Sequence, residues 1–312
     1  MSLAPEQRFK AACLAVFAVS ITSTQDAVIK GLAASLPAYE VVLIRGLVGL
    51  PILALWLALT DGFRTLFTPL LWPLLGRGLV LTAAYFCFIL AIAAMPIADA
   101  VAIYFTMPFF VAMLAGPFLG EQVPLYRWLA MLAAFIGVLI MVQPGKSGFE
   151  PASGFALLSA LGYAGGQMMG RHYSQRVAPV AIANVQNAVY LAVSSMLLVL
   201  INLFGFEWHG HKSLEFLFQP VVWPTAHGLV LLAVMGSFAA VGSVVFTYAY
   251  KYAQASFVAP FEYTSMFWAV AFGIFLFGDF PSVMTWAGMA IVIAAGLLMT
   301  WRDLQKPAYG TG

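Results

Sequence analysis

Long apolar segments of about 20 residues follow one another along nearly the whole chain, and they constrain its fold more than any motif does. A helix needs about 20 apolar residues to cross the hydrocarbon core of a bilayer. Prolines, glycines and charged residues separate ten such segments. They cover residues 9–34, 38–60, 69–94, 97–119, 124–143, 152–173, 178–204, 224–252, 255–277 and 281–301. The pattern predicts an all-α membrane protein with ten transmembrane helices.

Charged side chains are too few for a water-soluble fold. Lys, Arg, Asp and Glu together make up 8% of the 312 residues, against about 25% in a soluble domain. Hydrophobic residues make up 63%, which is more apolar surface than a soluble domain of this length can bury. The composition therefore excludes a soluble enzyme, a nucleic-acid-binding protein and a disordered chain.

The Lys and Arg residues predict how the chain crosses the membrane. If the N-terminus is cytoplasmic, ten basic residues fall on or near the inner side, and only Lys146 and Lys212 fall clearly outside. The ten are Arg8, Lys10, Arg64, Arg77, Arg127, Arg171, Arg176, Lys251, Arg302 and Lys306. Cytoplasmic loops of membrane proteins carry the excess of basic residues. We therefore expect both termini in the cytoplasm, in a multi-pass protein of the inner membrane.

The chain contains an internal repeat in two registers. Residues late in each half match at a constant spacing of 158, and residues early in each half match at a spacing of 141. The matched pairs include Phe88/Phe246, Thr106/Thr264, Gly120-Glu121/Gly278-Asp279, Trp128/Trp286, Asp26/Gln167 and Arg45/Gln186. The longer loop after the seventh segment absorbs the difference, 158 − 141 = 17 residues.

Each half therefore holds five segments. Because five is odd, the second half enters the membrane from the opposite side, and the two halves form an inverted repeat. The predicted units are residues 1–148 and 149–312. Many secondary transporters have this architecture, with the substrate site between the halves near mid-membrane.

The second segment reads Val41-Val42-Leu43-Ile44-Arg45-Gly46-Leu47, and Gly-Glu and Gly-Asp close the fourth and ninth. Together with ten spans in two halves, these features resemble the EamA-type branch of the drug/metabolite transporter superfamily, over residues 9–301. The resemblance implies a secondary transporter that moves small organic solutes by alternating access, most simply as an exporter of amino acids or related metabolites. A carrier for another metabolite, such as S-adenosylmethionine, is the alternative within the family.

Functions of other classes have less support. A membrane-embedded enzyme would need a catalytic motif, and no His-Glu-x-x-His, Gly-x-Ser-x-Gly or Cys-x-x-Cys pattern occurs. An ion channel usually assembles repeated filter segments from several subunits. His209 and His211 lack a third metal ligand at a recognisable spacing. We expect no catalytic residue, cofactor or metal. The expected partners are a small-molecule substrate and the bilayer, and the oligomeric state stays open, a monomer included.

Polar and aromatic residues within the spans are the candidates for contact with a solute. A polar side chain in hydrocarbon costs several kcal/mol unless it is paired or faces a cavity. The candidate cavity residues are Gln25, Asp26, Arg45, Tyr85, Tyr104, Tyr163, Gln167, Tyr248, Glu262, Tyr263 and Trp268. The aromatic members either line a cavity with an apolar face and a polar tip, or pack in the core.

Asp26 and Arg45 lie at matching depths in the first two spans. Each is about seven residues, or roughly 10 Å, from the outer end of its span, so the two side chains can meet. They bind a zwitterionic substrate or change partner between states, or else they form a fixed ion pair that ties the two spans. Gln167 and Gln186 hold the matching positions in the second half, so the charges do not act symmetrically.

Glu262 is an acid within the ninth span, and its repeat equivalent is Tyr104. It attracts a substrate amine or carries a coupling proton, or else it is a capped acid near the interface or a partner of Lys251. Pro108 and Pro260 release backbone groups and are expected to bend the fourth and ninth spans.

Gly162, Gly166 and Gly170 form a small-residue ridge on the sixth span. Small residues at this spacing allow helices to approach closely. The ridge is expected to pack within the bundle, with sliding during transport as the alternative.

Overall fold

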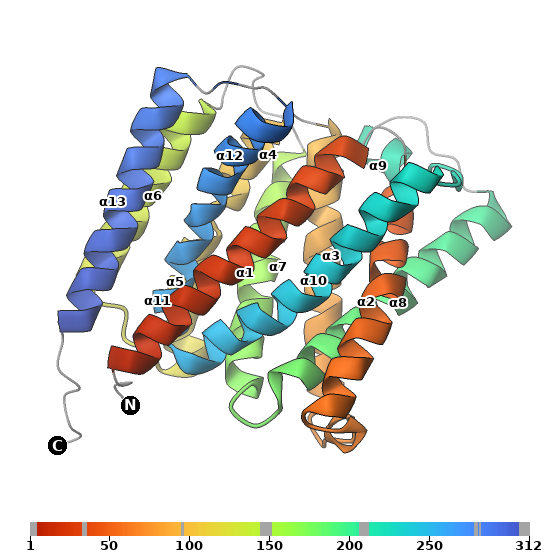
Figure 1. Cartoon of the computed structure of the whole chain (residues 1–312), viewed down its shortest axis with the longest axis horizontal. Coiled ribbons are helices and arrows are strands. Elements are labelled where there is room, and N and C mark those ends of the chain that lie inside the picture. Colours follow the sequence, from red (N-terminus) through yellow and green to blue (C-terminus); the bar gives the residue numbers. More distant parts are fainter. Residues whose placement is uncertain are drawn as a thin grey trace.

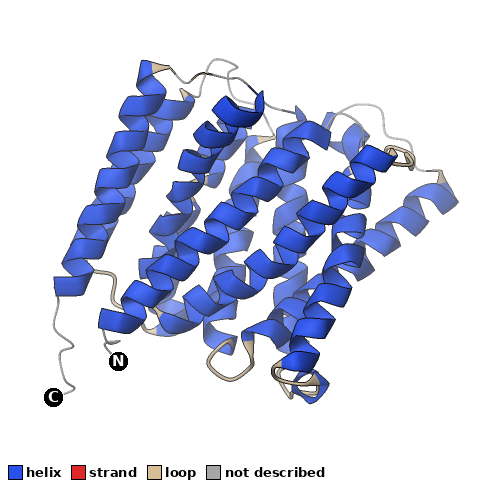
Figure 2. Cartoon of the chain, in the orientation of Figure 1, coloured by secondary structure: helices blue, strands red, loops and turns tan. Residues whose placement is uncertain are grey.

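The computed structural model describes residues 5–32, 36–94, 97–143, 152–205, 212–277, 280 and 282–305. Within these ranges all regular secondary structure is helical, and no strand occurs (Figures 1 and 2). The beginning of α1 and the end of α13 lie at the same end of the bundle (Figure 1).

Most helices of the described chain are long and uninterrupted. They are α1 (Pro5–Leu32), α2 (Ala38–Leu59), α3 (Leu71–Ala94), α6 (Leu125–Val142), α7 (Ser153–Tyr173), α8 (Pro179–Phe204), α10 (Ala226–Tyr252) and α13 (Val283–Gln305). Short turns of helix, η1 (Phe63–Leu66) and α9 (Lys212–Leu217), lie in the connections. The bounds of the long helices fall within four residues of those expected from the sequence.

Two of the expected segments are broken helices. The segment 97–119 divides into α4 (Ile97–Tyr104) and α5 (Met107–Leu119). The segment 255–277 divides into α11 (Ala255–Val258), the 3₁₀ turn η2 (Ala259–Thr264) and α12 (Ser265–Phe277). Pro108 lies in the first turn of α5 and Pro260 lies within η2, so both breaks occur where a proline removes a backbone donor.

The outer surface of the helices is apolar. Leu59, Leu203 and Leu297 are more than half exposed, as are many other large hydrophobic side chains. Six helical stretches are long and apolar enough to cross a membrane: Ala38–Leu59, Leu71–Ala94, Ala100–Leu119, Pro179–Phe204, Ala226–Tyr252 and Val283–Arg302. An apolar exterior of this kind is stable in lipid and not in water. The chain is therefore a multi-pass membrane protein.

Glycines set the closest helix contacts. On α7, the ridge of Gly162, Gly166 and Gly170 faces Ala84, Leu81 and Arg77 of α3 in turn. A Cβ at Gly166 would overlap the Leu81 side chain, and one at Gly170 would come to 3.0 Å from Arg77 Nη2. The expected packing role of the ridge is thus confirmed, with α3 as the partner.

Candidate functional site

A buried carboxylate lies at the break in the ninth segment. Glu262 belongs to η2 and is 8% exposed. The Tyr250 hydroxyl of α10 donates a hydrogen bond to Glu262 Oε1 at 3.1 Å, and the Tyr163 hydroxyl of α7 also reaches this carboxylate. Among the described residues, no Lys, Arg or His lies within salt-bridge distance of it. The described partners of Glu262 are therefore hydroxyl groups, and Lys251 is not one of them.

Aromatic rings from three segments gather around Glu262. The Tyr104 ring meets the Tyr163 ring edge-on, with centroids 5.8 Å apart. The Tyr263 hydroxyl donates to the Phe105 carbonyl oxygen at 3.0 Å, directly at the break between α4 and α5. The structure thus brings together four of the residues proposed from the sequence: Tyr104, Tyr163, Glu262 and Tyr263. We call this group the Glu262 cluster.

A second polar group joins α2, α3 and α8. Arg77 is 2% exposed, and its Nη1 donates to Gln186 Oε1 at 2.6 Å while its Nε donates to the Gly166 carbonyl oxygen at 3.0 Å. Gln186 Nε2 in turn donates to the Tyr190 hydroxyl at 3.5 Å. Arg45 Cζ lies 5.3 Å from the centroid of the Tyr190 ring. We call Arg45, Arg77, Gln186 and Tyr190 the arginine cluster.

The remaining candidates are distributed around these two groups. Tyr85 joins the arginine cluster, with its ring centroid 5.2 Å from Arg45 Cζ. Gln25 is buried, and its Oε1 has no hydrogen-bond partner among the described residues. Tyr248 stacks on Tyr252, away from the Glu262 cluster.

Two further candidates lie apart from both clusters' described contacts: Trp268 stacks on Phe272, and Gln167 is buried on α7. The remaining expectations concern residues that the structure does not describe. The Asp26 side chain lies outside the described residues, so its expected meeting with Arg45 stays a prediction. The His209/His211 pair and Gly278-Asp279 also lie outside them.

A dense polar network lies beside Arg8 in the first turn of α1, and Figure 1 shows the end of the bundle at which α1 begins. Glu121, between α5 and α6, accepts hydrogen bonds from the backbone N–H groups of Ala255 and Ser256 at 3.1 and 3.4 Å. Its Oε1 lies 3.8 Å from Arg171 Nε. Arg171 also donates to the last carbonyl oxygens of α10, those of Tyr250 and Lys251.

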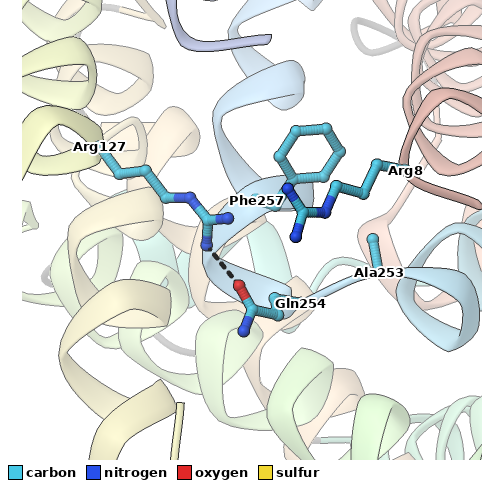
Figure 3. A pocket seen from close by; sticks show the side chains of 5 residues that line it. All are labelled: Arg8, Arg127, Ala253, Gln254 and Phe257. Atoms are coloured by element: carbon cyan, nitrogen blue, oxygen red, sulfur yellow. Dashed lines mark hydrogen bonds between the residues drawn. The ribbon is translucent and has the colours of Figure 1, made fainter. Parts of the chain in front are cut away.

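Arg127 of α6 adds a second tie across the same end. It is 3% exposed, and its Nη1 donates to Gln254 Oε1 at 2.8 Å and to Ser256 Oγ at 2.7 Å. Figure 3 shows the pocket beside it, where Arg8 and Phe257 also point inward. The pocket has a volume of about 10 Å³, which is room for about one water molecule and not for an organic solute. The hydrogen bonds and the small pocket show that these described residues pack closely together, and we call this end of the bundle the packed end.

The model of one protein family, described as "EamA-like transporter family", matches the chain twice, at residues 9–143 and 151–301. The chain belongs to the EamA-like transporter family. Its members are transporters, so this EamA-like protein is not an enzyme.

Several characterised relatives resemble this EamA-like chain over most of its length. A riboflavin transporter of Rhizobium johnstonii is 30% identical over 78% of this chain and 75% of its own. The pseudopaline exporter CntI of Pseudomonas aeruginosa is 27% identical over 92% and 94%. An S-adenosylmethionine uptake transporter of Rickettsia bellii is 24% identical over 90% of each chain. These relatives move different small molecules, in both directions, and none of the three is named for an amino acid.

A solved crystal structure shares the fold of this EamA-like protein. It has a TM-score of 0.77 at 16% identity and covers 94% of this chain and 98% of its own. At this identity the likeness concerns the fold alone.

Sequence reasoning missed several polar residues of this EamA-like transporter. Arg77, Arg127 and Arg171 were predicted only to lie on or near the inner side, and their burial was not foreseen. Arg77 and Arg127 are buried, and Arg171 faces buried partners. Glu121 was noted only as part of a Gly-acid pair. Glu40 lies in the first turn of α2, where it is 4% exposed and accepts a hydrogen bond from the Val222 N–H at 3.2 Å. The position of Glu40 within an apolar segment is the sequence feature that could have indicated a buried acid.

Proposed function

We propose that this protein is a secondary carrier that moves a small organic solute, an amino acid or a related metabolite, across the inner membrane by alternating access. Export is the proposed direction. The observation that carries the proposal is the Glu262 cluster, a buried carboxylate with hydroxyl partners at the break of a helix. Discontinuous helices that meet at mid-bundle are where secondary transporters place their substrate and coupling-ion sites.

Two inverted repeats, residues 1–148 and 149–312, are the proposed architecture. Under this scheme Phe105 is equivalent to Tyr263, 158 residues later, and Gly46 is equivalent to Asn187, 141 residues later. Both pairs are in contact: Tyr263 binds the Phe105 carbonyl at 3.0 Å, and Asn187 Nδ2 donates to the Gly46 carbonyl at 3.0 Å. Equivalent residues touch one another only beside a pseudo-two-fold axis. The contacts therefore support both registers of the repeat.

Ten spans with both termini in the cytoplasm are the proposed topology. The shared location of the start of α1 and the end of α13 supports an even number of crossings. Arg8 and Arg302 lie near these two helix ends, as the positive-inside rule expects. A reporter tag at residue 312 tests the topology, because it should react with impermeant reagents only after the cytoplasmic face is opened.

The polar network at the packed end fits one state of an alternating-access cycle. Glu121 and Arg127 belong to the proposed first half, whereas Arg171, Gln254 and Ser256 belong to the second. A carrier open at this end must separate these partners. In the proposed topology the network lies on the cytoplasmic side, so this conformation is closed to the cytoplasm.

Solute flux into proteoliposomes tests the proposal. Vesicles loaded with unlabelled amino acids are offered labelled ones outside, and parallel vesicles receive riboflavin or S-adenosylmethionine. Saturable exchange that is accelerated by internal solute would establish a carrier, since a channel shows no counterflow. Exchange of S-adenosylmethionine or riboflavin without amino-acid exchange would refute the proposed amino-acid substrate and support the carrier function. Conductance without saturation or counterflow would contradict the proposal.

A further inference from the structure

Arg77 is a deeply buried cation whose described partners are all neutral. It lies six residues after the start of α3, about 9 Å along the helix. Its hydrogen bonds go to the Gly166 carbonyl and the Gln186 amide oxygen, and no carboxylate of the described residues lies within salt-bridge distance. A charged side chain inside a membrane protein normally pairs with an opposite charge or marks a substrate pathway. Among the residues that the structure describes, Arg77 therefore has no counter-charge of the kind that its burial calls for.

The surroundings of Arg77 suit an anion better than a structural ion pair. Gln186, Tyr190 and Ser194 lie four residues apart on α8 and so share one face of that helix. Gln186 and Tyr190 are linked to Arg77, and one helical turn beyond Tyr190 the Ser194 Oγ is buried without a hydrogen-bond partner among the described residues. This face of α8 therefore offers Arg77 neutral hydrogen-bonding groups and no opposite charge.

Positive charge extends beyond Arg77 on the same side. The Arg45 guanidinium stacks against Tyr190, the residue that Gln186 joins to Arg77. In the second half, the position equivalent to Arg45 is Gln186 itself, and the position equivalent to Arg77 is Met235. The cationic face thus occurs on one side of the proposed axis only. An asymmetric site of this kind orients its ligand.

We propose that Arg77, with Gln186 and Tyr190, binds an anionic group of the transported solute, a carboxylate or a phosphate. This rests on the proposed carrier function and narrows its substrate class to solutes that carry a negative group. Arg77 donates to the Gly166 carbonyl of α7, and Tyr163, about one turn earlier on the same helix, reaches the Glu262 carboxylate. A zwitterionic solute would therefore find its anionic end at the arginine cluster and its cationic end at the Glu262 cluster.

The variant Gln186→Glu separates this role from a structural one. Because Gln186 Oε1 lies 2.6 Å from Arg77 Nη1, a glutamate there supplies the missing counter-charge from within the protein. If Arg77 only ties α3 to α8, the new ion pair should leave ligand binding and transport unchanged. If Arg77 binds an anion, the new carboxylate should occupy its place and prevent binding while the fold stays at least as stable.

Ligand-induced thermal stabilisation of the purified full-length chain in neutral detergent is the measurement. The probes are amino acids, each compared with its amide and its decarboxylated amine, and inorganic phosphate. We expect acids or phosphate to raise the melting temperature of the parent, and amides and amines to raise it less. Arg77→Gln and Gln186→Glu should weaken apparent binding at least about tenfold, which is about 1.4 kcal/mol. Arg64→Gln, an equal charge change on exposed η1, should bind as the parent does.

The outcomes divide clearly. Loss of the carboxylate response in both variants supports a carboxylate site, and loss of the phosphate response alone supports a phosphate site. Equal stabilisation by acid, amide and amine, retention of the response in Gln186→Glu, or no response to any anion overturns the proposal. The assay needs no gradient, so it reports binding independently of transport. If Arg77→Gln transports a neutral solute at the rate of the parent, the anion site is refuted and the proposed carrier function is retained.

Discussion

The Tyr263 hydroxyl donates a hydrogen bond of 3.0 Å to the carbonyl oxygen of Phe105, a residue 158 positions earlier. That distance along the chain is also the spacing of the sequence repeat. Tyr263 is 1% exposed and Phe105 5%, so the bond is buried where the broken helices of the two halves meet. The bond gives the Phe105 carbonyl, at the end of α4, a partner that the interrupted helix cannot supply.

Removal of this hydroxyl should destabilise the junction. We expect Tyr263→Phe to lower the free energy of unfolding by about 0.6–1.5 kcal/mol, because a buried carbonyl loses its donor. Thermal denaturation of the purified protein measures the loss. Tyr173→Phe is the matched control, since that hydroxyl forms no hydrogen bond with the residues that the structure describes. Equal melting temperatures for the two variants would show that the hydrogen bond from Tyr263 to Phe105 does not stabilise the fold.

Glu262 should be required for driven transport. We expect Glu262→Gln to reduce solute accumulation driven by a pH gradient at least about tenfold. The described partners of Glu262 are hydroxyl groups, so a proton or a cationic group of the solute must neutralise its charge. Gradient-driven uptake and solute exchange are measured side by side, with Asp26→Asn as a second variant. Exchange that survives in Glu262→Gln indicates proton coupling, and exchange that is lost indicates binding of a substrate amine. Unchanged rates in both assays would refute a functional role.

Loss of Glu121 should open the packed end. The carboxylate accepts two backbone hydrogen bonds and faces Arg171, so Glu121→Ala leaves several donors unsatisfied. We expect faster labelling of a cysteine that replaces Phe257, which is 1% exposed, by a maleimide in a background without Cys13 and Cys87. Asp61→Ala, at an exposed acid, is the control and should not change the labelling rate.

Two adjacent glycines of α7 should respond differently to the same substitution. A Cβ at Gly166 would overlap Leu81, whereas nothing lies within 4 Å of one at Gly165. We expect Gly166→Ala to lower the free energy of unfolding by about 1–3 kcal/mol through overpacking. Gly165→Ala should leave it unchanged or raise it by up to about 1 kcal/mol, because alanine favours helix. The free energies of unfolding of both variants are measured by denaturation in the same detergent. If Leu81→Ala restores the stability of Gly166→Ala, Leu81 is the side chain that collides with the added Cβ.

The sequence predicted helices well because the bilayer demands long apolar runs. Proline positions also indicated the two breaks: Pro108 and Pro260 lie directly at them. Tyr104, Tyr163, Glu262 and Tyr263 were proposed separately, and the structure groups them. Their grouping fits the register of the proposed repeat, in which residues 104 and 262 are equivalent positions.

The arginine cluster was less predictable. Arg77 stands near the start of an apolar segment, where a basic residue usually reaches the interface. Its burial depends on Gly170 of α7, which leaves room for the guanidinium, and on Gln186 of α8. Contacts between residues so far apart along the chain, 109 positions for Arg77 and Gln186, have no local sequence signal. Glu121 was likewise seen as a helix-ending residue, because its partners at Ala255 and Ser256 belong to the other half of the chain.

The bond from Asn187 to the Gly46 carbonyl has a consequence for the history of the two halves. If they descend from one ancestral segment that paired with its own copy, positions 46 and 187 were once occupied by the same amino acid. Two glycines there offer no side-chain donor, and two asparagines would crowd a site where a Cβ on residue 46 already collides with Leu191. Only after the two copies had become separate sequences could one keep the small residue and the other acquire the amide. In the proposed repeat this contact therefore needs two different sequences, which a pair of identical subunits could not supply.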